Sequence, residues 1–316
     1  MSRFRPTLPG LLAILLATGF LASPAPVQAQ TLRFSSYPAA VNGTFNPDAG
    51  TILTQTITIR HRGVACVYFV TFSTGQSGSF ASRRASSGAN LLSYQIYDSM
   101  SGRNVLKDLS ANPSLSEVLT GSFAASGTTW TTQNISYTVH LPPGQLPPAG
   151  TYSDTIAMEL YVGTPAGHGA RQQRVSFSLG ITVAAALDVS LVPTGAGFSA
   201  SSTALTLDFG PLAAGGSRAG DLVVRSNSLN TITVMSQNGG VLKNPDPADA
   251  SQVPYQLKVN GMALALPAGV PQPIATSAPA TGFSGTRYGM SVVIGSFGWA
   301  TEGSYSDVLT IQAAAN

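Results

Sequence analysis

Gly303-Ser304-Tyr305-Ser306-Asp307-Val308-Leu309-Thr310-Ile311 repeats an earlier stretch of the chain, Gly150-Thr151-Tyr152-Ser153-Asp154-Thr155-Ile156-Ala157-Met158. In both copies apolar residues recur at alternate positions after the tyrosine, which is typical of a half-buried β-strand. Tyr94-Gln95-Ile96 and Tyr255-Gln256-Leu257 match in the same order, and so do two β-rich runs that close at Gly75 and Gly239. Three matches in one order predict a duplicated β-domain.

The composition agrees with strands joined by turns. Charged residues make up 9% of the 316 residues, well below the roughly 25% of ordinary soluble domains, while hydrophobic residues reach 43% and there are 33 Gly and 21 Pro. Short alternating runs separated by Gly and Pro are typical of antiparallel sandwiches. We therefore predict an all-β fold with two Ig-like antiparallel β-sandwich domains, residues 30–186 and residues 187–316.

The N-terminus has the pattern of a signal peptide, which we place at residues 1–29. Arg3 and Arg5 precede an apolar run, and Val27-Gln28-Ala29 offers small residues for cleavage before Gln30. The alternative is a membrane anchor, but the run is short of the roughly 20 residues that a span needs. Cleavage would change 16 Lys+Arg against 13 Asp+Glu into 14 against 13, so we expect no nucleic-acid partner.

The two copies differ after their shared stretch. The first continues into an alternating run at residues 174–183, a further predicted strand, whereas 11 residues follow Tyr305. We therefore expect the second domain to lack its final strand and to have an open groove edge at Tyr305, Leu309 and Ile311, which face the core. A strand donated by another molecule would restore on the order of 10 kcal/mol, at about 1.5–3 kcal/mol for each buried apolar side chain.

Several of these residues resemble a known family. Residues 68–75, Arg83-Arg84, Leu92-Ser93-Tyr94-Gln95-Ile96-Tyr97-Asp98 and the terminal Gly-x-Tyr-Ser-Asp strand are similar to the spore coat protein U / Csu-type domain of archaic chaperone–usher pili. In the second copy, residues 207–212, 225–227 and 236–240 resemble the pilin-type version. Cys66, the one cysteine, stands where the family often has a disulfide partner, and its mate is absent. We expect a buried, inert thiol.

The resemblance implies a role. Stalk pilins of this family have one domain and an N-terminal donor extension, whereas two-domain members look like tip adhesins. The chain is thus expected to be a pilus tip subunit in adhesion and biofilm formation, carried through the periplasm to a cell-surface fimbrium of a Gram-negative bacterium. The implied partners are a periplasmic pilus chaperone, an outer-membrane usher, the next pilin subunit, which donates a strand, and a host or abiotic surface. Two alternatives stay open: a non-adhesive structural pilin, and a secreted, self-contained carbohydrate-binding β-module.

We find no pattern that predicts catalysis. His61, His140 and His168 lack metal-ligand spacing, and no nucleophile motif has its strand–turn–helix context. We expect no enzyme activity, cofactor or metal, and we expect Arg83 and Arg84 to be solvated loop charges. The candidate surface-binding residues lie in predicted loops of the first domain, although core packing is the other interpretation: Phe80, Leu115, Val118, Phe123 and Trp130.

Overall fold

The computed structural model describes residue 1, residues 30–99 and residues 104–316. The predicted signal peptide, apart from Met1, lies outside the described residues. The all-β fold class is confirmed, because the described elements are β-strands and three single-turn 3-10 helices, η1 (Gly75–Ser77), η2 (Leu109–Ala111) and η3 (Leu115–Glu117). In the described part of the chain, no helix has the length and apolar character needed to cross a membrane.

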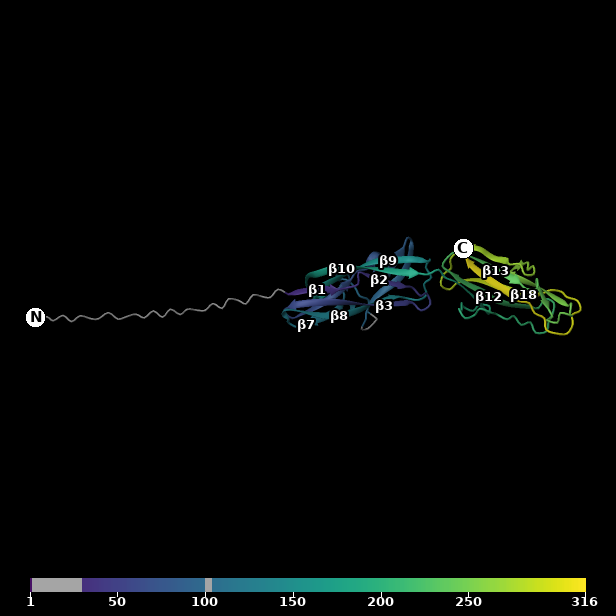
Figure 1. Ribbon diagram of the computed structural model, residues 1–316, viewed down its shortest axis with the longest axis horizontal. Helices are drawn as coiled ribbons and strands as arrows, with labels where there is room; N and C mark the ends of the chain where they lie inside the picture. Colours follow the sequence, from purple (N-terminus) through teal and green to yellow (C-terminus); the bar gives the residue numbers. More distant parts are fainter. Residues whose placement is uncertain (2–29, 100–103) are drawn as a thin grey trace.

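Residues 30–186 form what we call the N-terminal sandwich (Figure 1). Hydrogen bonds join its strands in the order β1-β3-β8-β6-β5-β9-β10-β2, and β4 pairs with both β9 and β7. All of these pairs are antiparallel except β2 with β10, which is parallel. The strands are β1 (Thr31–Ser36), β2 (Ala40–Thr44), β3 (Thr51–Gly63), β4 (Cys66–Phe72), β5 (Arg83–Ser87), β6 (Asn90–Asp98), β7 (Leu119–Phe123), β8 (Gly127–Leu141), β9 (Gly150–Thr164) and β10 (Gly167–Val183).

Residues 187–316 form the C-terminal sandwich, which is smaller. One sheet has the order β11-β12-β18-β15-β14, with β16 paired to β15, and the other has the order β17-β13-β19. No strand pair among the described residues joins the two sandwiches. The strands are β11 (Leu187–Val192), β12 (Ser217–Ser226), β13 (Asn230–Ser236), β14 (Val241–Lys243), β15 (Gln252–Val259), β16 (Met262–Leu264), β17 (Gln272–Ala278), β18 (Thr286–Ile294) and β19 (Leu309–Ala315).

The alternation of each strand explains its place in the core. From Val175 to Val183 of β10 every second residue is apolar and buried, so this face packs inward and the other meets solvent. In β9 the inward face has buried Tyr152, Ile156 and Met158. The same period of two places Ile57 and Ile59 of β3 inside, with no exposed surface. The main core cluster of the N-terminal sandwich includes Tyr137 and Phe177, and a smaller cluster contains Phe69, Val118 and Tyr161.

The sequence repeat recurs in the structure as the same hydrogen-bonded corner. Asp154 accepts hydrogen bonds from the Tyr94 hydroxyl, at 2.5 Å, and from the backbone N–H of Gln76, at 2.9 Å. Asp307 accepts the equivalent bonds from the Tyr255 hydroxyl, at 2.5 Å, and from the Asn238 N–H, at 3.0 Å. Each aspartate therefore ties the start of β9 or β19 to the loop after the neighbouring strand, β4 or β13.

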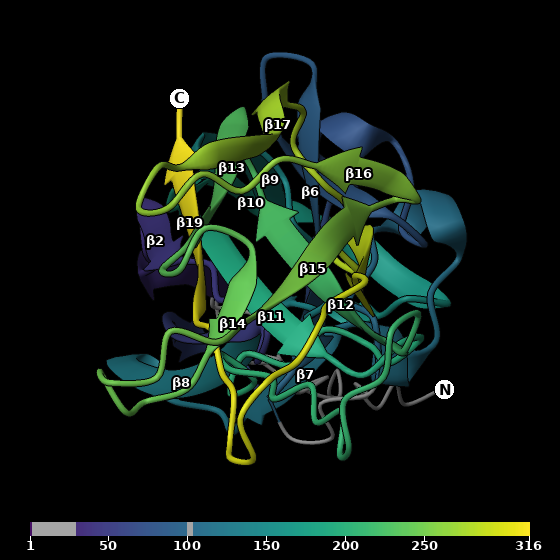
Figure 2. The ribbon, with the colours of Figure 1, turned by 90° about the vertical axis from the view of Figure 1, so that its right-hand side faces the viewer.

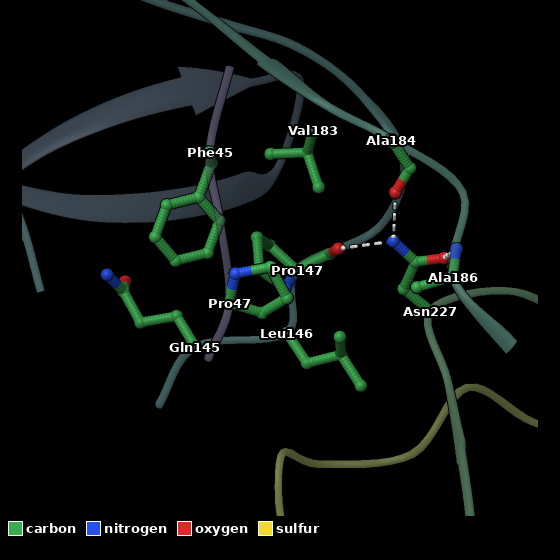
Figure 3. Close-up of a pocket in the computed structure, with 9 residues that line it drawn as sticks. All are labelled: Phe45, Pro47, Gln145, Leu146, Pro147, Val183, Ala184, Ala186 and Asn227. Carbon is green, nitrogen blue, oxygen red and sulfur yellow. Dashed lines mark hydrogen bonds between the residues drawn. The ribbon is translucent and has the colours of Figure 1, made fainter. Parts of the chain in front are cut away.

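The two sandwiches lie end to end (Figure 1), and Asn227 fastens the segment between them. Its side-chain amide donates to the Ala184 carbonyl, at 2.8 Å, and its Oδ1 accepts from the Ala186 N–H, at 2.8 Å (Figure 3). The same amide reaches the Pro147 carbonyl, at 3.2 Å. Apolar side chains at the ends of the N-terminal strands line a small cavity beside this contact: Phe45, Pro47, Leu146, Pro147 and Val183.

Candidate functional site: an open strand position in the C-terminal sandwich

The N-terminal sandwich shows what a filled final strand position looks like. There β10 lies between β9, to which it is antiparallel, and β2, to which it is parallel. Its inward-facing side chains are at most 9% exposed, and they close the gap between the two sheets: Val175, Phe177, Leu179, Ile181 and Val183.

The equivalent position in the C-terminal sandwich has no strand among the described residues. There β19 pairs with β13 on one side, with Val234 opposite Ile311, and its other edge has no described partner. Figure 2 views this sandwich end on and shows β19 at its left edge. Residues 203–209, which take the place of β2 in chain order, form no strand. The backbone N–H and C=O groups along the β19 edge are therefore available for pairing.

The apolar residues beside this position are correspondingly less covered. Tyr152, Ile156 and Met158 of β9 have no exposed surface. Their counterparts Tyr305, Leu309 and Ile311 are only half-buried. These three predicted groove-edge residues pack against one core cluster, and so do Leu207 and Phe209 from the unpaired segment. The structure thus brings the residues together along one side of the C-terminal sandwich.

The strand predicted from Gly303 begins later than the sequence indicates. Residues 150–154 belong to β9, whereas residues 303–307 have only an isolated bridge between Ser306 and Lys243, and β19 begins at Leu309. The first copy is held in a ladder because Gly150 and Tyr152 pair with Val183 and Ile181 of β10. Without that neighbour, the same sequence has no ladder to join.

The local polar groups are neutral or already paired. Burial, and next the hydrogen bond to Asp307, raise the pKa of Tyr255 well above its usual range. The carboxylate of Asp307 also accepts bonds from the Ser236 hydroxyl and the Val308 N–H, at 2.6 and 2.8 Å. Arg218 donates to the Asp208 carbonyl, at 2.7 Å. The open strand position thus combines apolar side chains with unpaired backbone groups along the β19 edge. These features suit the binding of an added β-strand.

The candidate surface-binding residues are dispersed. Leu115 in η3 and Trp130 in β8 are 57% and 38% exposed, and Phe80 is half-buried beneath the Arg83 guanidinium. Val118 and Phe123 are only 3% and 9% exposed. For these two the core-packing interpretation is correct, because Val118 packs with Phe69 and Tyr161, and Phe123 stacks on Tyr68.

Arg83 lies in a different environment from the one predicted. It is fully buried, opposite Tyr94 in the β5–β6 pair, and is not a solvated loop charge. Its guanidinium donates to the carbonyls of Ser73 and Leu106, at 2.9 and 2.6 Å, and to the Gln95 side chain, at 2.6 Å. Burial lowers the pKa of Arg83 to about 10. In the sequence, Arg83 follows Phe80 by three residues in a stretch with few charges. This pattern alone does not reveal that the Arg83 side chain is buried.

Cys66, at the start of β4, is a free thiol and is half-buried. Burial raises the pKa of this thiol above its usual value. It is therefore shielded less than expected, although its thiolate form is still disfavoured.

Comparisons with known proteins address the family. Residues 19–159 match the family model of the Spore Coat Protein U domain. A chain of the CsuC–CsuE chaperone–tip adhesion subunit complex of Acinetobacter baumannii is 12% identical, with 88% of this chain and 99% of that chain covered and a TM-score of 0.39. CfaE, the adhesive subunit of CFA/I fimbria of enterotoxigenic Escherichia coli, is 13% identical. The match covers 89% of this chain and 93% of CfaE, with a TM-score of 0.35. The CupB6 tip adhesin of Pseudomonas aeruginosa is 12% identical, with 90% of this chain and 92% of that chain covered and a TM-score of 0.34.

No curated protein matches the chain. Over residues 19–159 the chain is thus similar to the Spore Coat Protein U domain family.

Proposed function

We propose that the chain is a subunit of a chaperone–usher fibre and that its C-terminal sandwich is completed by a strand donated from another molecule. The observation that carries this proposal is the contrast between the equivalent residues Ile156 and Leu309. Ile156 is fully buried in a strand paired with β10, whereas Leu309 is half-buried beside an unpaired edge. The donated strand would present alternating apolar side chains, as β10 does.

We further propose a position at the fibre tip, with the N-terminal sandwich as the adhesive part that contacts a host or abiotic surface and supports biofilm formation. Two observations support the tip over a stalk position. The N-terminal sandwich has its own final strand, and residues 31–44 supply β1 and β2 to that same sandwich. In this proposal the chain passes through the periplasm of a Gram-negative bacterium with a pilus chaperone and an outer-membrane usher, and the next subunit inserts its donor strand beside β19.

The test uses the chain's own filled position as the template. We would append a second copy of residues 165–183, the hairpin and β10, after Asn316 of the mature chain, residues 30–316. We expect this extension to fold back along β19 and to stabilise the C-terminal sandwich by about 6–12 kcal/mol if four apolar side chains are buried. Denaturant unfolding measures the gain, and hydrogen exchange of the β19 amides locates it.

The matched control is the same extension with Phe177→Asp and Leu179→Asp in the appended copy, which keeps length and linker but removes the apolar face. It should give no gain. If the unextended mature chain is a stable monomer with protected β19 amides and the extension adds nothing, donor-strand completion is wrong and a self-contained β-module is favoured. Crosslinking of residues 31–41 to a second subunit would instead favour a structural pilin.

A further inference from the structure

Three arginines and a tryptophan gather on the outer face of one sheet of the N-terminal sandwich. Arg33 lies on β1, Arg60 and Arg62 lie on β3, and Trp130 lies on β8. The start of β1, the end of β3 and the start of β8 meet at one end of the sandwich, since Thr31 pairs with Arg62 and His61 with Thr131. This end is remote from the C-terminal sandwich (Figure 1). We call these four residues the arginine–tryptophan patch.

The patch is held in a defined arrangement. Arg33 is directly opposite Arg60 in the antiparallel β1–β3 pair, so both side chains leave the sheet on the same face. The guanidinium carbons of Arg60 and Arg62 lie 4.6 and 4.8 Å from the centroid of the Trp130 ring. Cation–π contact with one indole therefore keeps two positive charges side by side.

This arrangement is electrostatically unfavourable for the protein alone. Like charges directly opposite each other destabilise a strand pair, and no carboxylate among the described residues forms a salt bridge with any of the three arginines. Arg171, Arg174, Arg225 and Arg287 each have such a carboxylate. In addition, the Nε of Arg60 is buried without a hydrogen-bond partner. The patch thus has charge and hydrogen-bonding capacity that the described part of the chain does not satisfy.

An uncharged polar stripe continues from the patch along β3 and β8 toward the other sandwich. Thr58 donates to the Asn134 side chain at 2.8 Å, and the Thr56 and Ser136 hydroxyls are 2.9 Å apart. Thr132, opposite Arg60, is exposed in the same row. The face therefore joins a few strong cationic donors to hydroxyl and amide groups. Its exposed large apolar side chains on β3 and β8 are Trp130, within the patch, and Ile52, at the other end of β3.

We propose that the arginine–tryptophan patch binds an acidic polysaccharide whose anionic groups are carboxylates, a polyuronate. Arginine pairs with carboxylates in bidentate geometry, and the adjacent hydroxyl and amide stripe matches the free hydroxyl groups of a uronate ring. A lipid surface would require apolar residues for insertion. Single-stranded nucleic acid would require open aromatic faces, whereas Trp130 is already contacted by two guanidinium groups. A polyuronate would be the ligand class of the proposed adhesive part. Only the biological purpose of this binding rests on the proposed function.

The test measures binding of the folded full mature chain to alginate oligosaccharides by titration calorimetry, with or without the C-terminal extension, so that failure of donor-strand completion does not affect it. Arg33→Gln with Arg62→Gln removes two exposed charges and should weaken binding by about 10-fold or more. Arg84→Gln removes an exposed arginine on β5 and should change the affinity by less than about 2-fold. Unchanged unfolding transitions would establish that the variants are folded.

A charge-conserving variant separates bidentate recognition from simple attraction. Arg33→Lys with Arg62→Lys keeps the net charge, and we expect a loss of about 3-fold or more, because an ammonium group cannot form the forked pair. Neutral dextran should not bind. The proposal is overturned if alginate does not bind, if the lysine variant binds as the native chain does, or if anionic lipid vesicles or single-stranded DNA bind more tightly than alginate and depend on the same two arginines.

Discussion

The two sandwiches share a hydrogen-bonded corner but differ in what lies beside it. Asp154 and Asp307 each accept a tyrosine hydroxyl and a loop N–H with nearly the same distances. Yet the strand after the corner runs over Gly150–Thr164 in the first sandwich and only over Leu309–Ala315 in the second. The corner residues are the same, so they do not set the length of the strand. The neighbouring strands do, because a residue joins a ladder only where a partner strand lies beside it. β19 extends as far as its pairing with β13, whereas the first half of β9 pairs with β10.

A second difference lies in the interior. Arg83 pairs with Tyr94 in the first sandwich, whereas Gly240 stands opposite Tyr255 in the second, where its carbonyl accepts the Tyr255 N–H at 2.9 Å. The first sandwich therefore contains a buried cation that donates to several carbonyl groups. The second has no cation at this place, and the Ser236 hydroxyl accepts from the Gly239 and Gly240 N–H groups there. The larger sandwich has both the final strand and the polar fastening.

The largest expected effect comes from removing this fastening. Arg83→Met fills similar volume but leaves the carbonyls of Ser73 and Leu106 without donors. At about 1–3 kcal/mol for each unsatisfied group, the N-terminal sandwich should lose on the order of 2–6 kcal/mol. Denaturant unfolding, with hydrogen exchange to assign each transition to a sandwich, measures the loss.

Arg84→Met is the control, because Arg84 is exposed on the same strand, and it should shift the transition by less than about 0.5 kcal/mol. If Arg83→Met does not lower the free energy of unfolding of the N-terminal sandwich, the hydrogen bonds of the buried guanidinium do not stabilise it. The proposed difference between the two interiors would then be wrong.

A smaller effect separates the filled from the open strand position. Ile156→Ala should cost the N-terminal sandwich about 2–5 kcal/mol, since Ile156 is fully buried opposite Phe177 of β10. Leu309→Ala, at the equivalent half-buried position, should cost the C-terminal sandwich less, about 1–2 kcal/mol by the area that it covers.

The sharper form of this prediction adds the appended β10 copy. With the extension in place, Leu309 becomes covered and the cost of Leu309→Ala should rise toward that of Ile156→Ala. A cost that does not change when the extension is added would mean that the appended strand does not lie over Leu309. Equal costs in the unextended chain would mean that the two positions are equally covered in solution.

Part of this picture could be read from the sequence because it depends on local pattern. Alternation and turn residues predicted the strand at residues 174–183, which is the second half of β10. The spacing of Tyr305, Leu309 and Ile311 predicted which side chains face the core. A structural role for Asp154 and Asp307 at the start of each strand follows from their repetition alone. None of these features requires knowledge of a distant partner.

The remaining features depend on register between strands that are far apart in the chain. Arg83 is buried because the carbonyls of Ser73 and Leu106 converge on it. Val118 and Phe123 are buried because β7 pairs with β4. Likewise, Arg33 meets Arg60 only through the β1–β3 pairing, which a one-residue slip would abolish. Composition and period do not specify such cross-strand neighbours, so the sequence pattern indicates Trp130 as a candidate but does not reveal the three arginines beside it.

The smallest effect expected of a single substitution concerns alkaline pH. Burial raises the pKa values of Tyr68 and Tyr137 well above the usual range, and burial with the Asp154 bond does the same for Tyr94. A group whose folded pKa is raised contributes stability that is complete below its unfolded pKa, about 10 for tyrosine, and is lost as pH rises above that value. Each such tyrosine should remove about 1.4 kcal/mol per pH unit. Arg83 acts in the opposite sense, because its lowered folded pKa increases stability above pH of about 10.

The N-terminal sandwich should therefore lose more stability between pH 9 and 11 than the C-terminal sandwich, where Tyr255 is the main shifted group. Tyr137→Phe isolates one contribution, since the Tyr137 hydroxyl is buried with no hydrogen-bond partner in the described structure. This variant should match or exceed the native stability at pH 8 and gain about 1.4 kcal/mol over it at pH 11. Tyr94→Phe, which gives up the bond to Asp154, should instead be less stable at pH 8. Equal behaviour of the two variants in thermal unfolding at both pH values would contradict the assignment of the alkaline loss to buried hydroxyl groups.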